Sequence, residues 1–387
     1  MKPFVWDVDT RICFGSGQLD RIGTEAALLG RRALLVYGGG SIKRSGVYDR
    51  VCKSLAAAGV THCELPGVTP NPRCADADRG AALCREQGAE LVIAVGGGSS
   101  IDCAKAAAAA ACCGVPSWEL VAGRAPVTAA LPLLAVPTLA ATGSEMNTIA
   151  VISNPDTKEK IGMRAPALRP RTAIVDPTLP ATAPPLQVAS GAADIFAHAL
   201  ENYLGPEPAA LQDALAEGLL RTVVRFGPIA AADPGCTEAQ SELMWASCHA
   251  INGLLSLGKG HPWTAHTLEH QLSAFHDVTH GAGLAVLLPA WLTRTLDART
   301  APKLAQLGRR VFDLPPAGSE DAGARAAIAA MRRSFAALGL PDTLRGLGIA
   351  SDETLPAMAR QAASLLRPGG WTPLTADEIL QIFRACF

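Results

Sequence analysis

The sequence has no excess of charge of either sign, and this near balance argues against two classes of partner. Lys and Arg together number 34 and Asp and Glu number 35, which leaves a formal net charge of −1. Proteins that bind nucleic acids or membrane surfaces by electrostatic attraction carry clusters of basic residues. We therefore expect neither nucleic acid nor a membrane surface among the partners of this chain.

The chain also lacks a long apolar run that is free of proline. Its longest stretch without a charged residue, 125–144, contains Pro126, Pro132 and Pro137. A proline in a helix interior costs about 3 kcal/mol, so this stretch favours short buried strands and loops over a membrane helix. The N-terminus shows no apolar segment typical of a signal peptide. These patterns predict a cytoplasmic protein.

Paired cysteines are absent as well. The chain has 11 cysteines, but none forms a Cys-x-x-Cys pair, and an odd number spread over a long chain is a poor disulfide framework. We expect ordinary small, mostly buried thiols that serve neither as metal ligands nor as nucleophiles.

The first half of the chain alternates between strand and helix patterns. Short apolar runs at 33–37, 90–95, 131–136 and 173–175 predict buried strands, and the spacing of apolar residues predicts helices at 47–58 and 101–113. Such alternation predicts a parallel sheet with right-handed crossovers, as in a Rossmann-like α/β domain.

The pattern changes at a group of prolines between 177 and 185. Beyond it, strand signals almost disappear and helical patterns predominate, with predicted breaks at Gly227-Pro228, at 233–235 and at 315–316. With 387 residues and a prior of roughly 150 per domain, this change predicts two domains. They are an α/β domain over 1–185 and an all-α domain over 186–387.

Two segments of the first half suit a phosphate-bearing ligand. In the first, a strand runs into Gly96-Gly97-Gly98-Ser99-Ser100 before a helix, and glycines at a helix N-terminus let backbone N–H groups approach a phosphate closely. The second, 137–145, is rich in hydroxyl groups after an apolar strand. Neither segment is the G-x-G-x-x-G fingerprint.

Histidines are concentrated in the second half. Five of the 8 histidines fall within 261–280, namely His261, His266, His270, His276 and His280. A sixth, His198, follows Asp194 by four residues, which places both side chains on one face of a helix. A carboxylate with several imidazoles is typical of a divalent first-row metal site, and Fe²⁺ or Zn²⁺ fits best.

Helix geometry restricts which histidines can share one ion. In one continuous helix, His266 and His280 would lie about 21 Å apart, too far for one metal. We therefore predict a turn near 275–279. A competing interpretation is the H-x-x-E-H pattern at 266–270, which is found in zinc metallopeptidases with its glutamate as the base. That function would leave the glycine-rich half without a role.

Together these motifs resemble the iron-containing (group III) alcohol dehydrogenases. The resemblance rests on Gly-Gly-Gly-Ser-x-x-Asp-x-x-Lys at 96–105, Pro-Thr-x-x-x-Thr-Gly-Ser-Glu at 137–145, Asp-x-x-x-His at 194–198, and the histidines of 266–280. Chain length and the segment 37–41 resemble the branch of butanol dehydrogenases and NADPH-dependent aldehyde reductases most closely. The resemblance implies a dinucleotide-binding α/β domain, a helical metal-binding domain and an active site in the cleft between them.

The resemblance also implies roles for individual residues. The implied metal ligands are Asp194, His198, His266 and His280. His270 matches a family histidine beside the ligands and is implied to relay a proton. The implied cofactor-binding residues are Gly38, Gly39, Gly40, Ser41, Asn71, Gly97, Gly98, Ser99, Asp102, Thr138, Thr142, Asn147 and Lys160.

The reaction implied is reversible hydride transfer between a nicotinamide cofactor and a small aldehyde, in a homodimer or larger homo-oligomer. The loop after the first strand lacks the aspartate common in NAD-preferring relatives and continues into Lys43 and Arg44, so we expect NADP(H) to be preferred over NAD(H). Glycerol dehydrogenase-like and 3-dehydroquinate synthase-like enzymes on the same fold, and a non-enzymatic binding protein, are the alternatives.

Overall fold

A computed structural model describes residues 1–260, 263–366 and 371–387, which form two compact units. The sheet unit consists of 7–183 and 235–248, and the helical unit consists of 1–6, 184–234 and 249–387. The chain thus leaves the sheet unit at 183, close to the group of prolines, and returns to it for one short segment.

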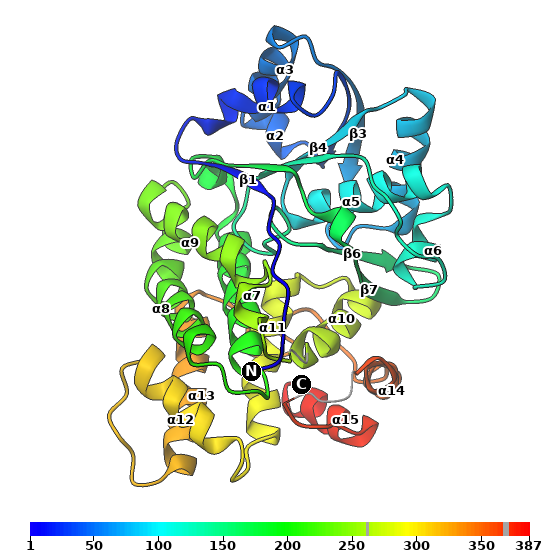
Figure 1. Cartoon of the computed structure of the whole chain (residues 1–387). Coiled ribbons are helices and arrows are strands. Elements are labelled where there is room, and N and C mark those ends of the chain that lie inside the picture. The colour runs from blue at the N-terminus through cyan, green and yellow to red at the C-terminus, as the bar shows by residue number, and fades with distance from the viewer. Residues whose placement is uncertain (261–262, 367–370) are drawn as a thin grey trace. The chain divides into compact units, whose positions relative to one another are not determined.

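The sheet unit contains a six-stranded sheet in the order β1-β8-β5-β4-β2-β3 (Figure 1). Its strands are β1 (Arg11–Phe14), β2 (Arg32–Gly38), β3 (Thr61–Val68), β4 (Leu91–Gly96), β5 (Leu133–Pro137) and β8 (Thr172–Val175). All neighbouring strands pair in parallel. The predicted parallel α/β architecture is therefore confirmed.

Helices cover both faces of this sheet, because its central strands are apolar on both sides. Leu34 and Val92 pack in one core with the alanine-rich helix α5, whereas Leu35 and Ile93 pack in another with α3. A separate hairpin joins β6 (Ile149–Asn154) and β7 (Glu159–Arg164). The helices are α1 (Ile22–Ala27), α2 (Ser41–Arg44), α3 (Val47–Ala57), α4 (Cys74–Glu86), α5 (Gly98–Cys113) and α6 (Ser117–Val121), with 3-10 turns at Gln18–Arg21, Pro166–Leu168 and Leu179–Thr182.

The helical unit has no strand among the residues that the structure describes, as predicted. Its helices are α7 (Pro185–Tyr203), α8 (Ala210–Ala232), α10 (Thr264–His276), α11 (His280–Arg294), α12 (Ala301–Val311), α13 (Glu320–Ala337), α14 (Leu355–Leu365) and α15 (Ala376–Ala385), with a 3-10 turn at Leu254–Ser256. Helix α9 (Thr237–Ala250) lies mostly within the segment that returns to the sheet unit. Among the described helices, none combines the length and the apolar character that crossing a bilayer requires.

The predicted helix break at Gly227-Pro228 is wrong, because α8 continues through Pro228 to Ala232. Packing explains the difference. A Cβ at Gly227 would lie 3.3 Å from the Cβ of Ala192 on α7 and 3.2 Å from Leu338, so α8 approaches its neighbours closely at this point. Burial against other helices outweighs the loss of one backbone hydrogen bond at a proline.

At Gly281, helix α11 approaches α7 even more closely, so a substitution there should change the stability of the fold. A Cβ built at Gly281 would lie only 1.8 Å from the carbonyl oxygen of Ser190, a backbone atom of α7. We expect Gly281→Ala to lower the free energy of unfolding by about 1–3 kcal/mol or more, since α11 must move away from α7. Urea denaturation of metal-free protein measures this loss.

The matched control is Gly218→Ala in the exposed part of α8. No atom lies within 4 Å of a Cβ built there, so alanine is expected to stabilise the chain by about 0.4–1 kcal/mol through the entropy of the unfolded state. Equal unfolding midpoints for Gly281→Ala and the unsubstituted chain would contradict the close contact between α7 and α11.

Candidate metal centre

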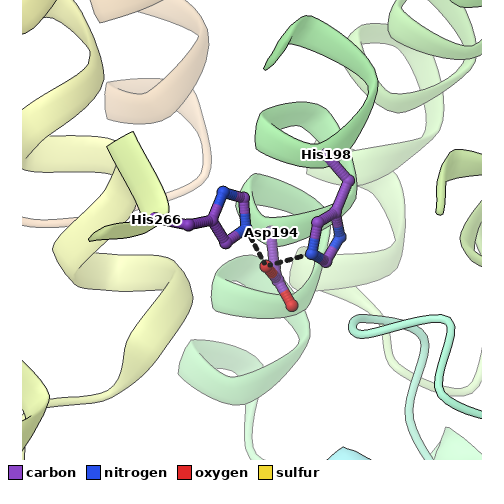
Figure 2. Close-up of side chains that lie close together, drawn as sticks. All are labelled: Asp194, His198 and His266. Carbon is purple, nitrogen blue, oxygen red and sulfur yellow. Dashed lines mark ion pairs between the residues drawn. The ribbon is translucent and has the colours of Figure 1, made fainter. Parts of the chain in front are cut away.

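One face of α7 presents Asp194 and His198, as the spacing predicted. The helix begins with prolines at 184 and 185, where a missing N–H is tolerated, and it is buried from Val188 to Tyr203. The Nε2 atom of His198 lies 3.6 Å from Oδ1 of Asp194. The carboxylate and the imidazole therefore face the same point inside the helical unit (Figure 2).

Helices α10 and α11 bring two further histidines to the same carboxylate oxygen. Nε2 of His266 lies 3.7 Å from Oδ1 of Asp194, and Nε2 of His280 lies 3.6 Å from it. Helix α10 ends at His276 and α11 begins at His280, with Asp277 in the left-handed region at a φ of 54°. The predicted turn between the two histidines is confirmed.

These atoms fit a divalent metal ion. Oδ1 of Asp194 and Nε2 of His266 are buried without a hydrogen-bond partner, a costly arrangement unless something binds them. The ligand atoms of Asp194, His198 and His266 all lie within 4.8 Å of one another. One carboxylate and three imidazole nitrogens are a donor set that suits Zn²⁺ or Fe²⁺.

Two buried glutamates contact the imidazoles of His266 and His280 at Nδ1, the ring nitrogen that does not face Asp194. Nδ1 of His266 contacts the carboxylate of Glu201, and Nδ1 of His280 contacts that of Glu269. Neither carboxylate has exposed surface. A carboxylate at Nδ1 fixes the tautomer and leaves Nε2 available for a metal.

Sequence reasoning did not anticipate the contacts of these two glutamates. Glu269 entered only as the base of the H-x-x-E-H pattern, whereas in the structure it accepts a hydrogen bond from Ser273 and contacts His280. It is thus already engaged, which argues against the metallopeptidase interpretation. Glu201 follows His198 by three residues on α7, and this helical spacing was the available signal.

The remaining histidines of the cluster differ in their surroundings. The ring of His270 lies 5.5 Å from that of His280 and 6.5 Å from that of His266, measured between centroids, and His270, Glu269 and His280 form a second group of metal-ligand type. His276 instead hydrogen-bonds Thr354 at 2.8 Å. His261 lies outside the described residues.

Burial and neighbouring charge set the protonation of the centre. Burial alone would raise the pKa of Asp194, but the three imidazoles around it hold that pKa well below its usual range. Burial lowers the pKa of His198 to about 3. For His266, burial would lower the pKa, but the neighbouring carboxylates of Asp194 and Glu201 outweigh that effect and raise the pKa to about 9. These shifts favour an ionised Asp194 and a neutral His198, whereas His266 would have to release a proton before its Nε2 could coordinate an ion.

The two glycine-rich segments of the sheet unit come together because β2 and β4 are parallel neighbours, with Tyr37 opposite Val95. From β2 the chain continues to β3 on one side, whereas β4 lies on the other. Such a switch in strand order is where open α/β sheets bind ligands, at the carboxyl ends of the strands. Gly38–Ser41 and Gly97–Ser99 follow these two ends.

The hydroxyl-rich loop lies over the start of α5. A Cβ at Gly98 would come within 2.3 Å of Thr142, and the N–H of Thr138 donates to the carbonyl of Gly96 at 3.0 Å. The predicted residues Gly97, Gly98, Ser99, Thr138 and Thr142 therefore form one surface around the N-terminus of α5, where free N–H groups and the helix dipole favour an anion.

The polar residues predicted near the cofactor are partly engaged with the protein. Asp102 accepts hydrogen bonds from the Ser144 hydroxyl at 2.5 Å and from the N–H of Val151 at 2.9 Å. The amine of Lys105 donates to the side-chain and backbone oxygens of Asn147. Asp102 thus fixes the hydroxyl-rich loop through Ser144, and Lys105 fixes Asn147.

A second pair of predicted residues also meets, since the amine of Lys160 donates to Asn71 at 2.8 Å. The returning segment contributes as well. Ser247 accepts a hydrogen bond from the N–H of Gly143, and the thiol of Cys248 donates to Glu145. Sequence reasoning gave no indication that this segment supports the loop.

The two basic residues that follow β2, Lys43 and Arg44, differ in their contacts. The amine of Lys43 lies 3.9 Å from the carboxylate of Glu64 and 4.5 Å from the ring of Tyr48, and the hydroxyls of Tyr37 and Tyr48 also donate to Glu64. Lys43 is therefore already paired. The guanidinium of Arg44 has no hydrogen bond or ion pair among the described residues, and it lies against Gly40, 3.7 Å from a Cβ built there.

Comparison with protein families identifies both halves of the chain. Residues 9–177 match the family model described as iron-containing alcohol dehydrogenase, and residues 188–387 match the model described as Fe-containing alcohol dehydrogenase family, C-terminal. Together the matches cover nearly the whole chain.

Similar proteins of named activity cover the full length. NADH-dependent butanol dehydrogenase A of Clostridium acetobutylicum is 43% identical over 393 residues, which span 100% of both chains. NADPH-dependent aldehyde reductase YqhD of Escherichia coli is 38% identical over 391 residues, again 100% of each. The crystal structure of NADH-dependent butanol dehydrogenase A from Thermotoga maritima superposes with a TM-score of 0.95 at 34% identity and covers 100% of this chain and 99% of the other.

Proposed function

The chain belongs to the iron-containing alcohol dehydrogenase family, in its butanol dehydrogenase and aldehyde reductase branch, and we propose that it holds its metal through the four residues gathered in the helical unit. These residues are Asp194, His198, His266 and His280. The observation that carries the proposal is the convergence of three Nε2 atoms, at 3.6–3.7 Å, on one buried oxygen of Asp194. The ion is Fe²⁺ or Zn²⁺.

The reaction is the reversible interconversion of a small aldehyde and its primary alcohol. When bound, the ion supplies a Lewis acid for the carbonyl oxygen, and the nicotinamide supplies or accepts the hydride. Glu201 and Glu269 keep the ligand imidazoles oriented. His270, whose ring is 5.5 Å from that of His280, is proposed to hold and pass the proton that the alcohol gains or loses.

We further propose that the sheet unit binds NADP(H) in preference to NAD(H). The diphosphate is placed at the N-terminus of α5, beside Gly97, Gly98 and Ser99. The 2′-phosphate is placed at Gly39, Gly40 and Ser41, in a loop whose residues 38–44 include no acidic side chain and in which the guanidinium of Arg44 has no ion pair among the described residues. One of the relatives named above is NADH-dependent and another is NADPH-dependent, so membership of the family does not decide the cofactor.

A cytoplasmic location and a homo-oligomeric state complete the proposal. All 11 cysteines are free thiols, as is usual in reducing compartments. Phe14 and Trp245 pack edge to face on the sheet unit while 39% and 45% exposed, and such a pair of aromatic residues is suited to an interface with a second copy.

The test of the function is a panel of straight-chain aldehydes assayed with NADPH and with NADH. We expect reduction of small aldehydes that is lost on chelation and restored by Fe²⁺ or Zn²⁺, with no turnover in 3-dehydroquinate synthase or glycerol oxidation assays. Full activity in chelator-treated, metal-free protein would contradict the proposed role of the centre. Turnover in either of the other assays would favour the corresponding alternative enzyme.

A further inference from the structure

Glu201 occupies an unusual position, because one fully buried carboxylate meets three donors from another helix. It accepts hydrogen bonds from the backbone N–H groups of Ala265 at 2.9 Å and of His266 at 3.2 Å, and it also contacts Nδ1 of the His266 imidazole. A buried carboxylate without such donors would be strongly destabilising. All three donors belong to the first turn of α10.

The N-cap side chain of α10 makes no capping hydrogen bond among the described residues. The N-cap residue is Trp263, which adopts the left-handed region at a φ of 48°. Bulky residues rarely adopt that conformation, and a helix N-terminus is normally stabilised by a capping oxygen from its own N-cap residue. Glu201 on α7 supplies the missing oxygen, and its negative charge complements the dipole of α10.

Glu269 provides an internal comparison. It orients His280 through Nδ1 and accepts a hydrogen bond from Ser273 at 2.6 Å. Glu269 contacts side-chain groups of His280 and Ser273, whereas Glu201 contacts two backbone N–H groups of α10 as well as the His266 side chain. The two carboxylates share the contact to a ligand imidazole and differ in the capping of a helix.

We propose that Glu201 is a positioning residue that couples two events: it caps α10 in place of an N-cap side chain, and through the same carboxylate it aims Nε2 of His266 at the metal. The metal half of this inference rests on the proposed function, whereas the capping half does not. Loss of Glu201 therefore weakens metal binding and loosens the start of α10, whereas loss of Glu269 weakens metal binding alone.

The experiment uses Glu201→Gln and Glu269→Gln, with the exposed Glu353→Gln as control. Zinc affinity is measured by competition with a chromogenic chelator. Amide hydrogen exchange over 264–270 is followed in the metal-free protein. We expect both variants of the buried glutamates to bind zinc about 10- to 100-fold more weakly, only Glu201→Gln to exchange faster at the start of α10, and the control to match the unsubstituted chain in both measurements.

Unchanged zinc affinity in Glu201→Gln would overturn the positioning role, and unchanged exchange over 264–270 would overturn the capping role. If Glu201→Gln does not fold, Glu201→Asp, which keeps the charge but shortens its reach, is measured in the same way, and unchanged values there overturn the proposal equally. If the unsubstituted chain binds no zinc or iron, the proposed metal function fails. In that case, the amide hydrogen exchange over 264–270 still tests whether Glu201 caps α10.

Discussion

Alanine at any one of the four proposed ligands is expected to abolish metal binding and nearly all aldehyde reduction, while the fold survives. The four are Asp194, His198, His266 and His280. Each contributes one atom to a small buried centre, so removing one leaves an incomplete donor set. The fold survives because the centre occupies only one face of α7, and the rest of the helix packs through apolar residues. Metal content, circular dichroism and activity are measured on each variant.

His270→Ala is the matched control, since it removes a nearby imidazole that lies outside the proposed ligand set. This variant is expected to keep the metal and lose only part of the rate. The opposite pattern, in which His270→Ala loses the ion and His266→Ala retains it, would show that the ligand assignment is wrong. It would also revive the H-x-x-E-H interpretation.

Gly39→Asp is expected to reverse the cofactor preference from NADPH to NADH. In the unsubstituted loop, charge-assisted hydrogen bonds to a 2′-phosphate contribute about 1.5–3 kcal/mol each, and two of them give a preference of roughly two orders of magnitude. Aspartate repels the phosphate and accepts hydrogen bonds from the free ribose hydroxyls instead. Gly39 has no atom within 4 Å of a built Cβ, so the side chain fits. The ratio of kcat/KM for the two cofactors is measured.

Two companion variants locate the cation that binds the phosphate. Arg44→Ala should lower kcat/KM with NADPH and leave that with NADH unchanged. Lys43→Ala should have a smaller effect on the ratio, since its amine already faces Glu64. Equal use of both cofactors by the unsubstituted enzyme would show that this loop does not discriminate at the 2′ position.

The central strands of the sheet could be predicted because their burial on both faces produces continuous apolar runs. β2, β4, β5 and β8 are of this kind. The two edge strands, β1 and β3, were both missed, and β3 includes Glu64, Pro66 and Gly67, which interrupt any apolar run. Edge strands tolerate such residues, and no periodicity reveals them.

The proposed metal ligands could be predicted from the sequence, whereas the glutamates that contact two of the ligand imidazoles could not. Asp194 and His198 have a helical spacing, and the distance of about 21 Å that a continuous helix would put between His266 and His280 indicated a turn before His280. The contacts of Glu201 and Glu269 depend on how α7, α10 and α11 pack against one another, which local sequence does not encode. Packing against neighbouring helices also explains why α8 continues past Pro228, although proline disfavours a helix interior.

The number of tightly bound divalent ions per chain is the most direct test of the central claim. Two groups of metal-ligand type adjoin in the helical unit: Asp194, His198 and His266 form one, and Glu269, His270 and His280 form the other. A single centre around Asp194 predicts one Fe²⁺ or Zn²⁺ per chain in anaerobically purified protein, and none in Asp194→Ala. Two ions per chain, or one ion that persists in Asp194→Ala, would contradict it.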